Sequence, residues 1–597
     1  MSIHSGSFTF DAQSPGPSGI GHAGLVMTQG TSVWLGETVS ARPGRLRHLI
    51  ATWDGRLDNR EDLRLRLAAP HDAADTDRET ALAVFERWGI AGLGFLVGEW
   101  SIAIFDGSTR TIHLARDYMG VRPLSYCVDA SGAAWSADLG ELVERTARAE
   151  ALSDIFAARF MGLRPSADVT PYEGVHAVPP GVCVSIDARG RLVQTRLWTL
   201  NPGDIRYRDE RTYEEHLRAL WSDAVQARLR TSGAVWAELS GGLDSSSVVC
   251  MADRAIRAGR VGAQSLHLVS HATLQSPEGD ERRFIAEVER QVGVMSQIVG
   301  VEDHQEHADA GRAWLTPYAL QGVGLEVVRR VRKAGGSVVL SGRLGDAVMG
   351  CQPDNSAAVF DDLADGRFLA SIAKLRRWSR ATKKPFVEIA WRLLAADDSA
   401  PADTGVELLA PRLRSMLDAA TRVEAPAHVR RSKRALARMV LAYASTARLD
   451  VPLRPPDVVY TFPFTHRPLI DFVLAIPGEQ LSAPGITRAL MRRAFAGLLP
   501  PRIAARLSKG YYPPAAFRAA RRLAASMLPA SELEVVQRGW IDGDRLRAAI
   551  RALTDGAGNT GGDIQSVLAL ERWLEARRTR SAIPQRKEVN TNEVLHA

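Results

Sequence analysis

The order of apolar and polar positions divides the chain into two halves with different patterns. In the first 200 residues, short apolar stretches are separated by Gly, Asp and Asn, which favour turns, and this predicts a β-rich half. The expected strands are residues 46–53, 100–105, 111–115 and 182–186. Apolar residues three or four positions apart predict helices between them. These expected helices are residues 59–67, 78–88 and 153–161.

From about residue 213, apolar strand-like segments alternate with amphipathic segments. The expected strands are residues 235–239, 266–270 and 337–340. The expected helices are residues 213–229, 246–258 and 281–292. Strands that alternate with helices predict a parallel, doubly wound sheet, and beyond about residue 355 the pattern is mostly helical.

Pro, Gly and charged residues gather at 201–212, which predicts a linker between two domains. We expect a first domain at residues 1–205, a second at 206–580 and a disordered polar tail at 581–597. The length of 597 residues fits more than one domain. With 45% hydrophobic and 24% charged residues, the composition excludes a collagen, a coiled-coil rod and a mainly disordered chain.

Cysteine content and charge narrow the class of protein further. The four cysteines form no CxxC pair, which argues against a disulfide scaffold or zinc ribbon and favours a cytoplasmic location. The net charge is +7, with a basic cluster at residues 374–384, but no nucleic-acid-binding signature accompanies it, so we expect no nucleic-acid partner. We find no signal peptide and no apolar run of about 18 residues, so we expect no membrane segment.

The most informative segment is Ser240-Gly241-Gly242-Leu243-Asp244-Ser245-Ser246, between an expected strand and an expected helix. Two glycines let the backbone approach an anion, and the helix N-terminus adds free N–H groups and a positive dipole end. The serines add hydroxyl donors, while the Asp244 carboxylate suits a Mg²⁺ ion bound to phosphates. No lysine follows the glycines, so this loop is not a P-loop of the GxxxxGK[ST] type.

This segment resembles the pyrophosphate loop of the asparagine-synthetase group of ATP pyrophosphatases. Further segments resemble the family's motifs in the expected order, from the amidotransferase domain to the C-terminal part of the ligase domain. They are residues 55–63, 113–124, 341–346, 460–470 and 499–510. The resemblance implies an α/β protein: an N-terminal glutaminase-like β-sandwich of N-terminal-nucleophile (Ntn) type and a C-terminal doubly wound ATP pyrophosphatase domain with added helices.

The resemblance also implies the cofactors ATP and Mg²⁺ and a set of site residues. Asp244 and Asp346 would hold Mg²⁺ on the ATP phosphates, and Lys509 would neutralise charge that develops at the leaving group. The phosphate loop would comprise Ser240, Gly241, Gly242, Asp244, Ser245 and Ser246. The adenosine pocket would be lined by Leu239, Val269, Ser341 and Gly342.

The first domain departs from the family at its glutaminase site. Asparagine synthetases use an N-terminal cysteine nucleophile, but here Ser2 follows Met1 and no cysteine precedes Cys127. The family's Asn-Gly-Glu segment is Asp54-Gly55-Arg56, so a carboxylate replaces an amide donor and a cation replaces an acceptor. We therefore interpret the domain as an inactive glutaminase kept for structure. The amine must then come from another substrate or from the molecule that supplies the acid.

Position 343 indicates a changed acceptor. Asparagine synthetases have Glu and β-lactam synthetases Tyr at this position, whereas this chain has Arg343. An arginine cannot act as a base at neutral pH, but it can hold a carboxylate with two hydrogen bonds. For the base itself the sequence offers three weak candidates. They are Asp280, Glu281 and His466.

Among families with an intact ligase half and no N-terminal cysteine, residues 276–282 and 462–469 most resemble lasso peptide cyclases, the macrolactam synthetases. That resemblance implies a leaderless precursor peptide as substrate. An Asp or Glu side chain is adenylated and joined to the peptide's N-terminal amine, with release of AMP and pyrophosphate. It also implies partners, a leader peptidase and a leader-binding protein, for which the basic cluster at 374–384 is a candidate contact.

Three other hypotheses stay open. The chain could be a small-molecule amide or β-lactam synthetase, an asparagine synthetase, or a non-catalytic scaffold derived from such an enzyme. Asp244, Asp346 and Lys509 argue against a scaffold, because a dead ATP site would be free to lose them. A precursor-peptide gene beside this one would favour the peptide cyclase over a small-molecule ligase.

Overall fold

The structure is a computed structural model, and it describes most of the chain. The described residues are 4–10, 23–28, 31–37, 44–68, 76–162, 164, 166–273, 279–301, 303, 321–350, 357–395, 406–418, 423–450, 458–507, 521, 524, 529–555 and 561–582.

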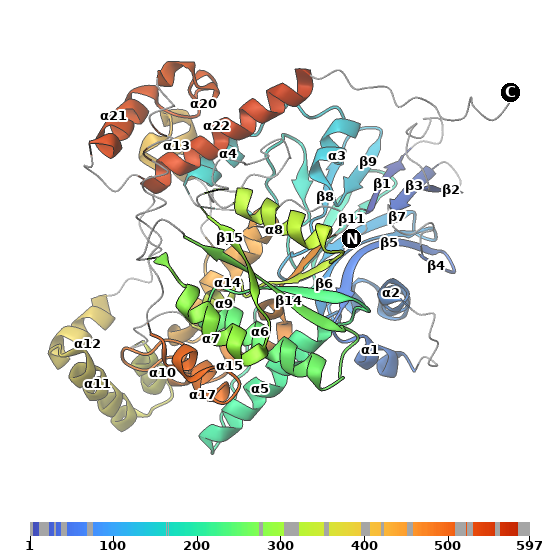
Figure 1. The fold of residues 1–597 in the computed structure, drawn as a ribbon. Helices are drawn as coiled ribbons and strands as arrows, with labels where there is room; N and C mark the ends of the chain where they lie inside the picture. The colour runs from blue at the N-terminus through green and yellow to red at the C-terminus, as the bar shows by residue number, and fades with distance from the viewer. Residues whose placement is uncertain are drawn as a thin grey trace.

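The first half is a sandwich of two antiparallel sheets, on the right in Figure 1. The first has the order β10-β8-β9-β1-β3-β2 and consists of β1 (His4–Thr9), β2 (Ala23–Thr28), β3 (Thr31–Glu37), β8 (Ser125–Val128), β9 (Gly132–Ser136) and β10 (His176–Ala177). The second has the order β12-β11-β7-β6-β5-β4 and consists of β4 (Gly44–Leu46), β5 (Leu49–Leu57), β6 (Gly98–Asp106), β7 (Thr111–Arg116), β11 (Val182–Asp187) and β12 (Leu192–Arg196). Between the sheets lies an apolar core that includes Phe8, Phe105 and Trp135.

Helices cover both outer faces of this sandwich. α1 (Arg60–Leu67) and α2 (Asp77–Leu93) bury Leu63 and Phe85 against the second sheet. α3 (Leu139–Arg145) and α4 (Asp154–Met161) pack together with helices from the far end of the chain. Those helices are α13 (Pro411–Asp418), α20 (Glu534–Gln537), α21 (Gly543–Thr554) and α22 (Gly561–Ala582). The last part of the chain therefore returns to the first half, as Figure 1 shows at its top.

The second half is built on a five-stranded parallel sheet with the order β15-β14-β13-β16-β17. Its strands are β13 (Ala234–Glu238), β14 (Ser265–Ala272), β15 (Ser296–Gly300), β16 (Val338–Leu340) and β17 (Val459–Thr461). The connecting helices are α5 (Glu210–Ala227), α6 (Leu243–Arg257), α7 (Arg282–Val292), α8 (Gln321–Lys333) and α9 (Gly345–Met349). β13, the first strand of this sheet along the chain, lies between β14 and β16, so the carboxyl ends of β13 and β16 are side by side. Doubly wound sheets bind ligands at such a point, where the strand order reverses.

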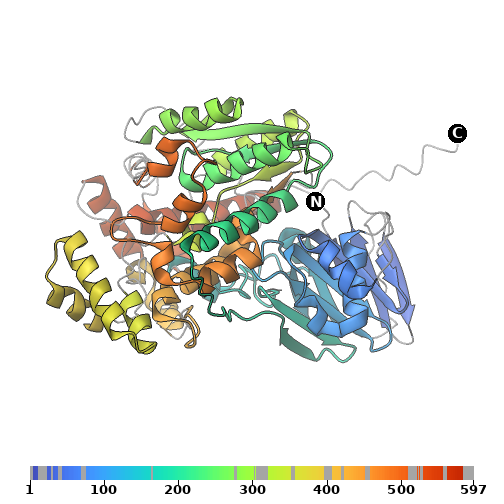
Figure 2. The ribbon, with the colours of Figure 1, turned by 90° about the horizontal axis from the view of Figure 1, so that it is seen from below.

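The remaining helices follow α9. α10 (Ala358–Ala364), α11 (Phe368–Thr382) and α12 (Phe386–Ala395) form a lobe at the edge of the molecule in both views, on the left in Figure 2. The others are α14 (Arg431–Asp450), α15 (Arg467–Ala475), α16 (Gly478–Leu481), α17 (Ala489–Ala494), α18 (Pro501–Ala505) and the short 3₁₀ turns η3 (Val406–Leu408), η4 (Pro463–Thr465) and η5 (Ala530–Glu532). Among the residues that the structure describes, no helix is long and apolar enough to cross a membrane.

The predicted fold class is confirmed: a sandwich half is followed by a parallel doubly wound half with added helices. The expected strand 46–53 is divided, because a turn at Arg47–His48 separates β4 from β5. The expected linker is shorter, because Asp209 caps α5 and helix begins at Glu210. β15, α8 and β17 were not predicted from the pattern. α22 extends to Ala582, so two residues of the expected tail are helical, and residues 583–597 lie outside the described part.

Candidate active site

The loop after β13 presents the start of α6 as an open anion site. α6 begins at Leu243, three residues earlier than predicted, and Gly242 is its N-cap without a side-chain hydrogen bond. Gly241 has a φ of +67°, and a Cβ there would come within 2.7 Å of Phe284 Cβ and 2.9 Å of the Ile285 nitrogen. Only glycine fits this position, because it lets the loop pack directly against α7. The first N–H groups of α6 then remain available to bind an anion.

Serine hydroxyls fix the shape of this loop. Ser245 Oγ accepts from the Ser240 nitrogen at 3.1 Å, lies 3.0 Å from Ser240 Oγ and donates to the Gly242 carbonyl at 3.3 Å. Arg506 donates to the Gly241 carbonyl at 3.0 Å. Ser246 Oγ is buried and has no hydrogen-bond partner within the described part of the chain. A buried hydroxyl without a partner is unfavourable, so Ser246 marks a place where a polar ligand atom fits.

The loop after β16 packs directly on the first loop. A Cβ on Gly342 would lie 2.7 Å from the Ser245 nitrogen, and one on Gly345 would lie 2.4 Å from Asp244 Cγ. The two glycines therefore permit the close approach that brings Asp244 and Asp346 together, although 101 residues lie between them in the sequence. The structure thus places the predicted residues of both loops at one end of the sheet.

A guanidinium group joins these two aspartates. Arg488 Nη1 lies 2.7 and 2.6 Å from the Asp244 carboxylate oxygens and 3.0 Å from Asp346 Oδ1. Arg488 precedes α17 in a left-handed conformation, with φ of 55°, which costs an L-residue about 1–2 kcal/mol. Sequence reasoning missed this residue, because nothing distinguishes it from the neighbouring arginines 492 and 493.

The paired aspartates suit a Mg²⁺ ion that arrives with a nucleotide. Arg488 shows that both carboxylates reach one common cation. In the described part, no three His, Cys, Asp or Glu side chains gather as a complete metal site. Mg²⁺ in nucleotide enzymes is commonly held by one or two carboxylates plus substrate phosphates, so two aspartates beside a phosphate-binding loop fit it.

The other predicted site residues lie in three different environments. Leu239 and Val269 are fully buried, and the Leu239 nitrogen donates to the Val269 carbonyl at 2.9 Å. Ser341 donates from its nitrogen to Thr461 and from its Oγ to Glu238 Oε2, at 3.0 and 2.5 Å. Arg343 is exposed on the second loop. Lys509 lies outside the described residues.

The three candidate bases are all engaged elsewhere. His466 Nδ1 lies 2.9 Å from Asp58 Oδ2, at the junction between the two halves. Asp280 accepts from the Arg282 side chain on the surface. Glu281 is buried and pairs with Arg506. All three therefore have a charged partner, and that of Glu281, Arg506, also donates to the Gly241 carbonyl of the first loop.

His4, in the first strand of the amidotransferase-type half, is buried. Its Nδ1 lies 3.0 Å from Thr52 Oγ1, its Nε2 lies 3.0 Å from Ser101 Oγ, and its ring is fully buried. Burial lowers the pKa of His4 to about 4, although the nearby Asp54 opposes the shift. A neutral imidazole held between two hydroxyls has a structural role here. Residues 1–3 lie outside the described part.

A buried ionic network joins the halves. Arg228 donates to Asp58 Oδ2 at 3.0 Å and to Glu99 Oε1 at 3.2 Å, and all three side chains have at most 1% exposure. Glu99 also accepts from Thr461 Oγ1 and the Phe462 nitrogen, each at 2.8 Å. Burial alone would raise the pKa of Asp58, but Arg228 and Arg56 outweigh it and hold the pKa well below its usual range.

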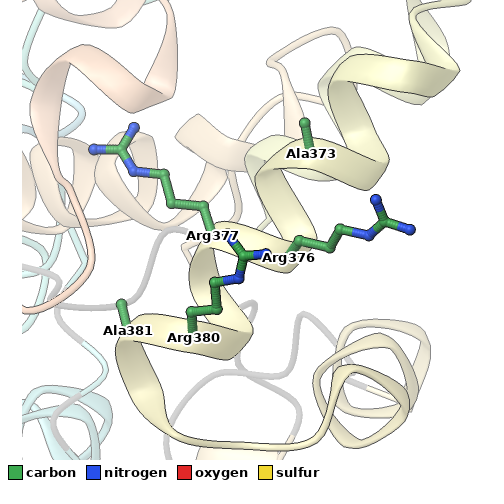
Figure 3. Close-up of a pocket in the computed structure, with 5 residues that line it drawn as sticks. All are labelled: Ala373, Arg376, Arg377, Arg380 and Ala381. Atoms are coloured by element: carbon green, nitrogen blue, oxygen red, sulfur yellow. The ribbon is translucent and has the colours of Figure 1, made fainter.

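The predicted basic cluster lies on α11. Arg376, Arg377 and Arg380 line a hollow of about 560 Å³ together with Ala373 and Ala381 (Figure 3). Figure 3 shows Arg376 and Arg377 directed to opposite sides of the helix. No ion pair of these three arginines occurs among the described residues. Phe368, Leu369 and Ile372 are exposed at the other end of the same helix.

Comparison with known proteins agrees with this geometry. The family model described as asparagine synthase matches residues 216–575. The model described as a glutamine amidotransferase domain matches residues 42–198. The two matches fall on the parallel-sheet half and on the sandwich half, and the first extends into the C-terminal helices that pack against the sandwich.

Three curated relatives show how broad the likeness is. The chain is 27% identical to "Amidase chyE" of Penicillium rubens, over 50% of this chain and 46% of that protein. It is 29% identical to "Asparagine synthetase [glutamine-hydrolyzing] 3" of Bacillus subtilis, over 34% of this chain and 33% of that protein. It is 30% identical to "Carboxyethyl-arginine beta-lactam-synthase" of Streptomyces clavuligerus, over 39% of this chain and 42% of that protein. The matched regions thus span less than half the length of these relatives.

Proposed function

The chain belongs to the asparagine synthase family, whose members are ATP-dependent ligases that form C–N bonds, and from this membership we propose that it joins a carboxylate to an amine with release of AMP and pyrophosphate. One observation carries the proposal. Both loops meet at the carboxyl end of the parallel sheet, with an open helix N-terminus and two converging aspartates. Phosphates fit the helix end, and a cation fits the aspartates.

The proposed substrate is a peptide. We propose that an Asp or Glu side chain of a leaderless precursor is adenylated and then attacked by the N-terminal amine of the same peptide, so that a macrolactam ring closes, as in lasso peptide cyclases. Ser2 in place of the family's cysteine, and Asp54 and Arg56 in place of its Asn and Glu, support an amine that does not come from glutamine. The resemblance of residues 276–282 and 462–469 supports a peptide substrate.

Each residue has a defined part in this proposal. Ser240, Gly241, Gly242, Ser245 and Ser246 hold the phosphates at the start of α6, and Asp244 and Asp346 hold Mg²⁺, which neutralises phosphate charge when bound. Leu239, Val269, Ser341 and Gly342 lie beneath the adenosine, Arg343 pairs with a peptide carboxylate, and Lys509 stabilises charge on the leaving group. Holding the two reacting groups together turns ring closure into an oriented unimolecular step.

The basic surface of α11 is the proposed contact for a polypeptide. The arginines of α11, which have no ion pair among the described residues, and the exposed Phe368 and Leu369 at the start of the helix fit an acidic, amphipathic segment of the peptide or of a partner such as a leader peptidase or leader-binding protein. Lys374 pairs with Glu479 of α16 at 3.3 Å, so this surface is joined to the helices that lead to Arg488. In this proposal residues 1–205 are a structural domain, 206–580 the ligase and 581–597 a tail, in a cytoplasmic enzyme.

Mass spectrometry of synthetic peptides tests the function. The protein is incubated with ATP, Mg²⁺ and a panel of peptides that have a free N-terminus and one Asp or Glu. We expect a product lighter by one water, one AMP for each ring closed, and neither product with Asp244→Asn. Asp253→Asn is the matched control, since Asp253 lies on the same helix and pairs with Arg257, which is largely exposed.

The other outcomes separate the alternatives. AMP formed without a change in peptide mass contradicts the peptide cyclase and favours a small-molecule ligase, the activity named for the Streptomyces clavuligerus relative. Asparagine made from aspartate with glutamine or ammonia would identify an asparagine synthetase. Absence of AMP under every condition, with partner proteins present, contradicts a ligase and leaves a scaffold.

A further inference from the structure

Three titratable side chains gather beside the two loops and are not among the residues assigned above to the nucleotide. Glu238 ends β13, His271 lies near the end of β14, and Tyr460 is in β17. In the sheet register Glu238 is opposite Val269, which is two residues before His271 in β14. On the other side of β13, Trp236 is opposite Val339 of β16, and Val339 is opposite Tyr460 of β17. Because residues two apart in a strand share a face, all three side chains lie on the same face of the sheet.

The polar atoms of this cluster lie close together without a full set of hydrogen bonds. His271 Nε2 lies 4.0 Å from Glu238 Oε1, too far for a hydrogen bond. His271 Nε2 is buried and has no hydrogen-bond partner in the described part of the chain, while the buried Tyr460 hydroxyl interacts with Glu238. The side chains of His271 and Glu238 are 28% and 16% exposed, so solvent reaches part of each. A buried imidazole nitrogen without a partner, on a side chain that is partly exposed, fits a ligand that donates a hydrogen bond.

The second loop orients this cluster. Ser341 Oγ donates to Glu238 Oε2 at 2.5 Å, so the carboxylate is fixed by the same loop that positions Asp346. The Arg343 nitrogen lies 3.4 Å from the same Ser341 hydroxyl. The cluster is therefore next to the site where the activated carboxyl group would form, on the side of Arg343.

Burial, more than the nearby charges, favours a neutral His271. Burial lowers the pKa of His271, Glu238 opposes this shift and Arg343 reinforces it. Burial and Glu238 together raise the pKa of Tyr460 well above its usual value, so the phenol stays protonated. The titratable and charged groups near His271 are therefore Glu238 from β13, Tyr460 from β17 and Arg343 from the second loop. The neighbouring strand β15, Ser296–Gly300, has no titratable residue. A neutral imidazole can accept a proton.

We propose that His271 is the general base that accepts the proton of the attacking amine, and that Glu238 is a positioning residue that stabilises the imidazolium formed. The inference rests on the proposed function. The amine nitrogen bonds to the acyl carbon of the carboxyl adenylate, and the C–O bond to the phosphate breaks. AMP leaves with that electron pair, and one N–H proton passes to His271. Arg343, in the position where related enzymes have Glu or Tyr, cannot accept this proton.

The test separates adenylation from amide formation. With the peptide that the protein cyclises, ATP–pyrophosphate exchange reports adenylation, and ring formation reports amine attack. We expect His271→Asn to slow ring formation by about 100-fold or more, the usual contribution of a general base, while exchange changes by less than about 2-fold. His267→Asn is the matched control, since His267 lies on the same strand and face but stacks on Trp236. The control should cyclise at the wild-type rate.

Two further readouts identify a base rather than a structural role. Hydroxylamine, which attacks as a neutral amine, should trap the adenylate of the N-acetylated peptide equally well in wild type and His271→Asn. Glu238→Gln should move the acid limb of the pH–rate profile to lower pH, because Glu238 raises the pKa of His271.

Each outcome decides the inference. Unchanged cyclisation by His271→Asn overturns it, and so does an equal loss of exchange, hydroxamate and ring, which would indicate a role in adenylation or folding. An acid limb that stays in place in Glu238→Gln overturns the role of Glu238. Absence of exchange in the wild-type protein would instead contradict the proposed function.

Discussion

Two clusters in this protein have the same composition, two carboxylates that share one arginine, but they are built for different purposes. Asp58, Glu99 and Arg228 lie at the junction of the halves and are at most 1% exposed. Asp244, Asp346 and Arg488 lie at the carboxyl end of the parallel sheet, where Asp346 is 49% exposed. The burial of the first cluster favours a permanent ion pair, whereas the exposure of Asp346 in the second favours one in which the cation can exchange.

The junction cluster is satisfied from several sides. Asp58 also contacts Arg56 and His466, and Glu99 also accepts from Thr461 and the Phe462 nitrogen. A buried ion pair compensates its desolvation only when its remaining hydrogen-bonding positions are filled in this way. At the loop cluster the Arg488 guanidinium meets both carboxylates and Asp346 is half exposed, so we expect that another cation can replace the arginine.

The largest expected effect is on stability. Arg228→Met leaves two buried carboxylates without their shared cation, and we expect the free energy of unfolding to fall by about 3–5 kcal/mol. Urea unfolding followed by circular dichroism measures it. Arg218→Met is the control, since its pair with Glu214 is half exposed and should contribute at most about 1 kcal/mol. Equal effects of the two substitutions would contradict the comparison.

A smaller effect is expected in the pH dependence of stability. The pKa of Asp58 is lower in the folded than in the unfolded state, so its stabilisation is present above the unfolded pKa of about 4 and is lost as pH falls through the folded value. We expect Asp58→Asn to cost about 2 kcal/mol at pH 7 and less at pH 3. Burial raises the pKa of Asp117 to about 6, so Asp117 alone would make the fold more stable on acidification. Because wild type and Asp58→Asn both contain Asp117, this contribution cancels when their free energies of unfolding are subtracted. A difference that grows on acidification would refute the ion pair.

The smallest effect concerns the loop cluster. If Arg488 is exchangeable, Arg488→Gln should bind Mn²⁺ without nucleotide about 10-fold more tightly than wild type, a gain of about 1.4 kcal/mol, because no guanidinium competes for Asp244 and Asp346. Electron paramagnetic resonance of free Mn²⁺ measures this. Arg493→Gln is the matched control on α17, since Arg493 pairs with Glu214 and Gln480. The same Mn²⁺ affinity in all three proteins would show that Arg488 does not compete.

Local pattern predicted the fold class and much of the first loop, but not the start of α6. Ser246 was expected to begin the helix, whereas Leu243 begins it. The reason is that Gly242 can cap a helix through its backbone alone, and the residues that follow it have no apolar periodicity to reveal the first turn. The division of the expected strand 46–53 was missed because Arg47 adopts a left-handed turn conformation that arginine rarely takes.

The sequence by itself determined what depends on neighbouring residues: two halves of different periodicity and a glycine-rich loop at a helix start. Only the tertiary structure decided which distant charges meet. Arg488 reaches Asp244 across 244 positions, Thr461 reaches Glu99 across 362, and Glu238 faces His271 through strand order. Such pairings follow from strand order and loop packing, which act over the whole fold and leave no local periodicity in the chain.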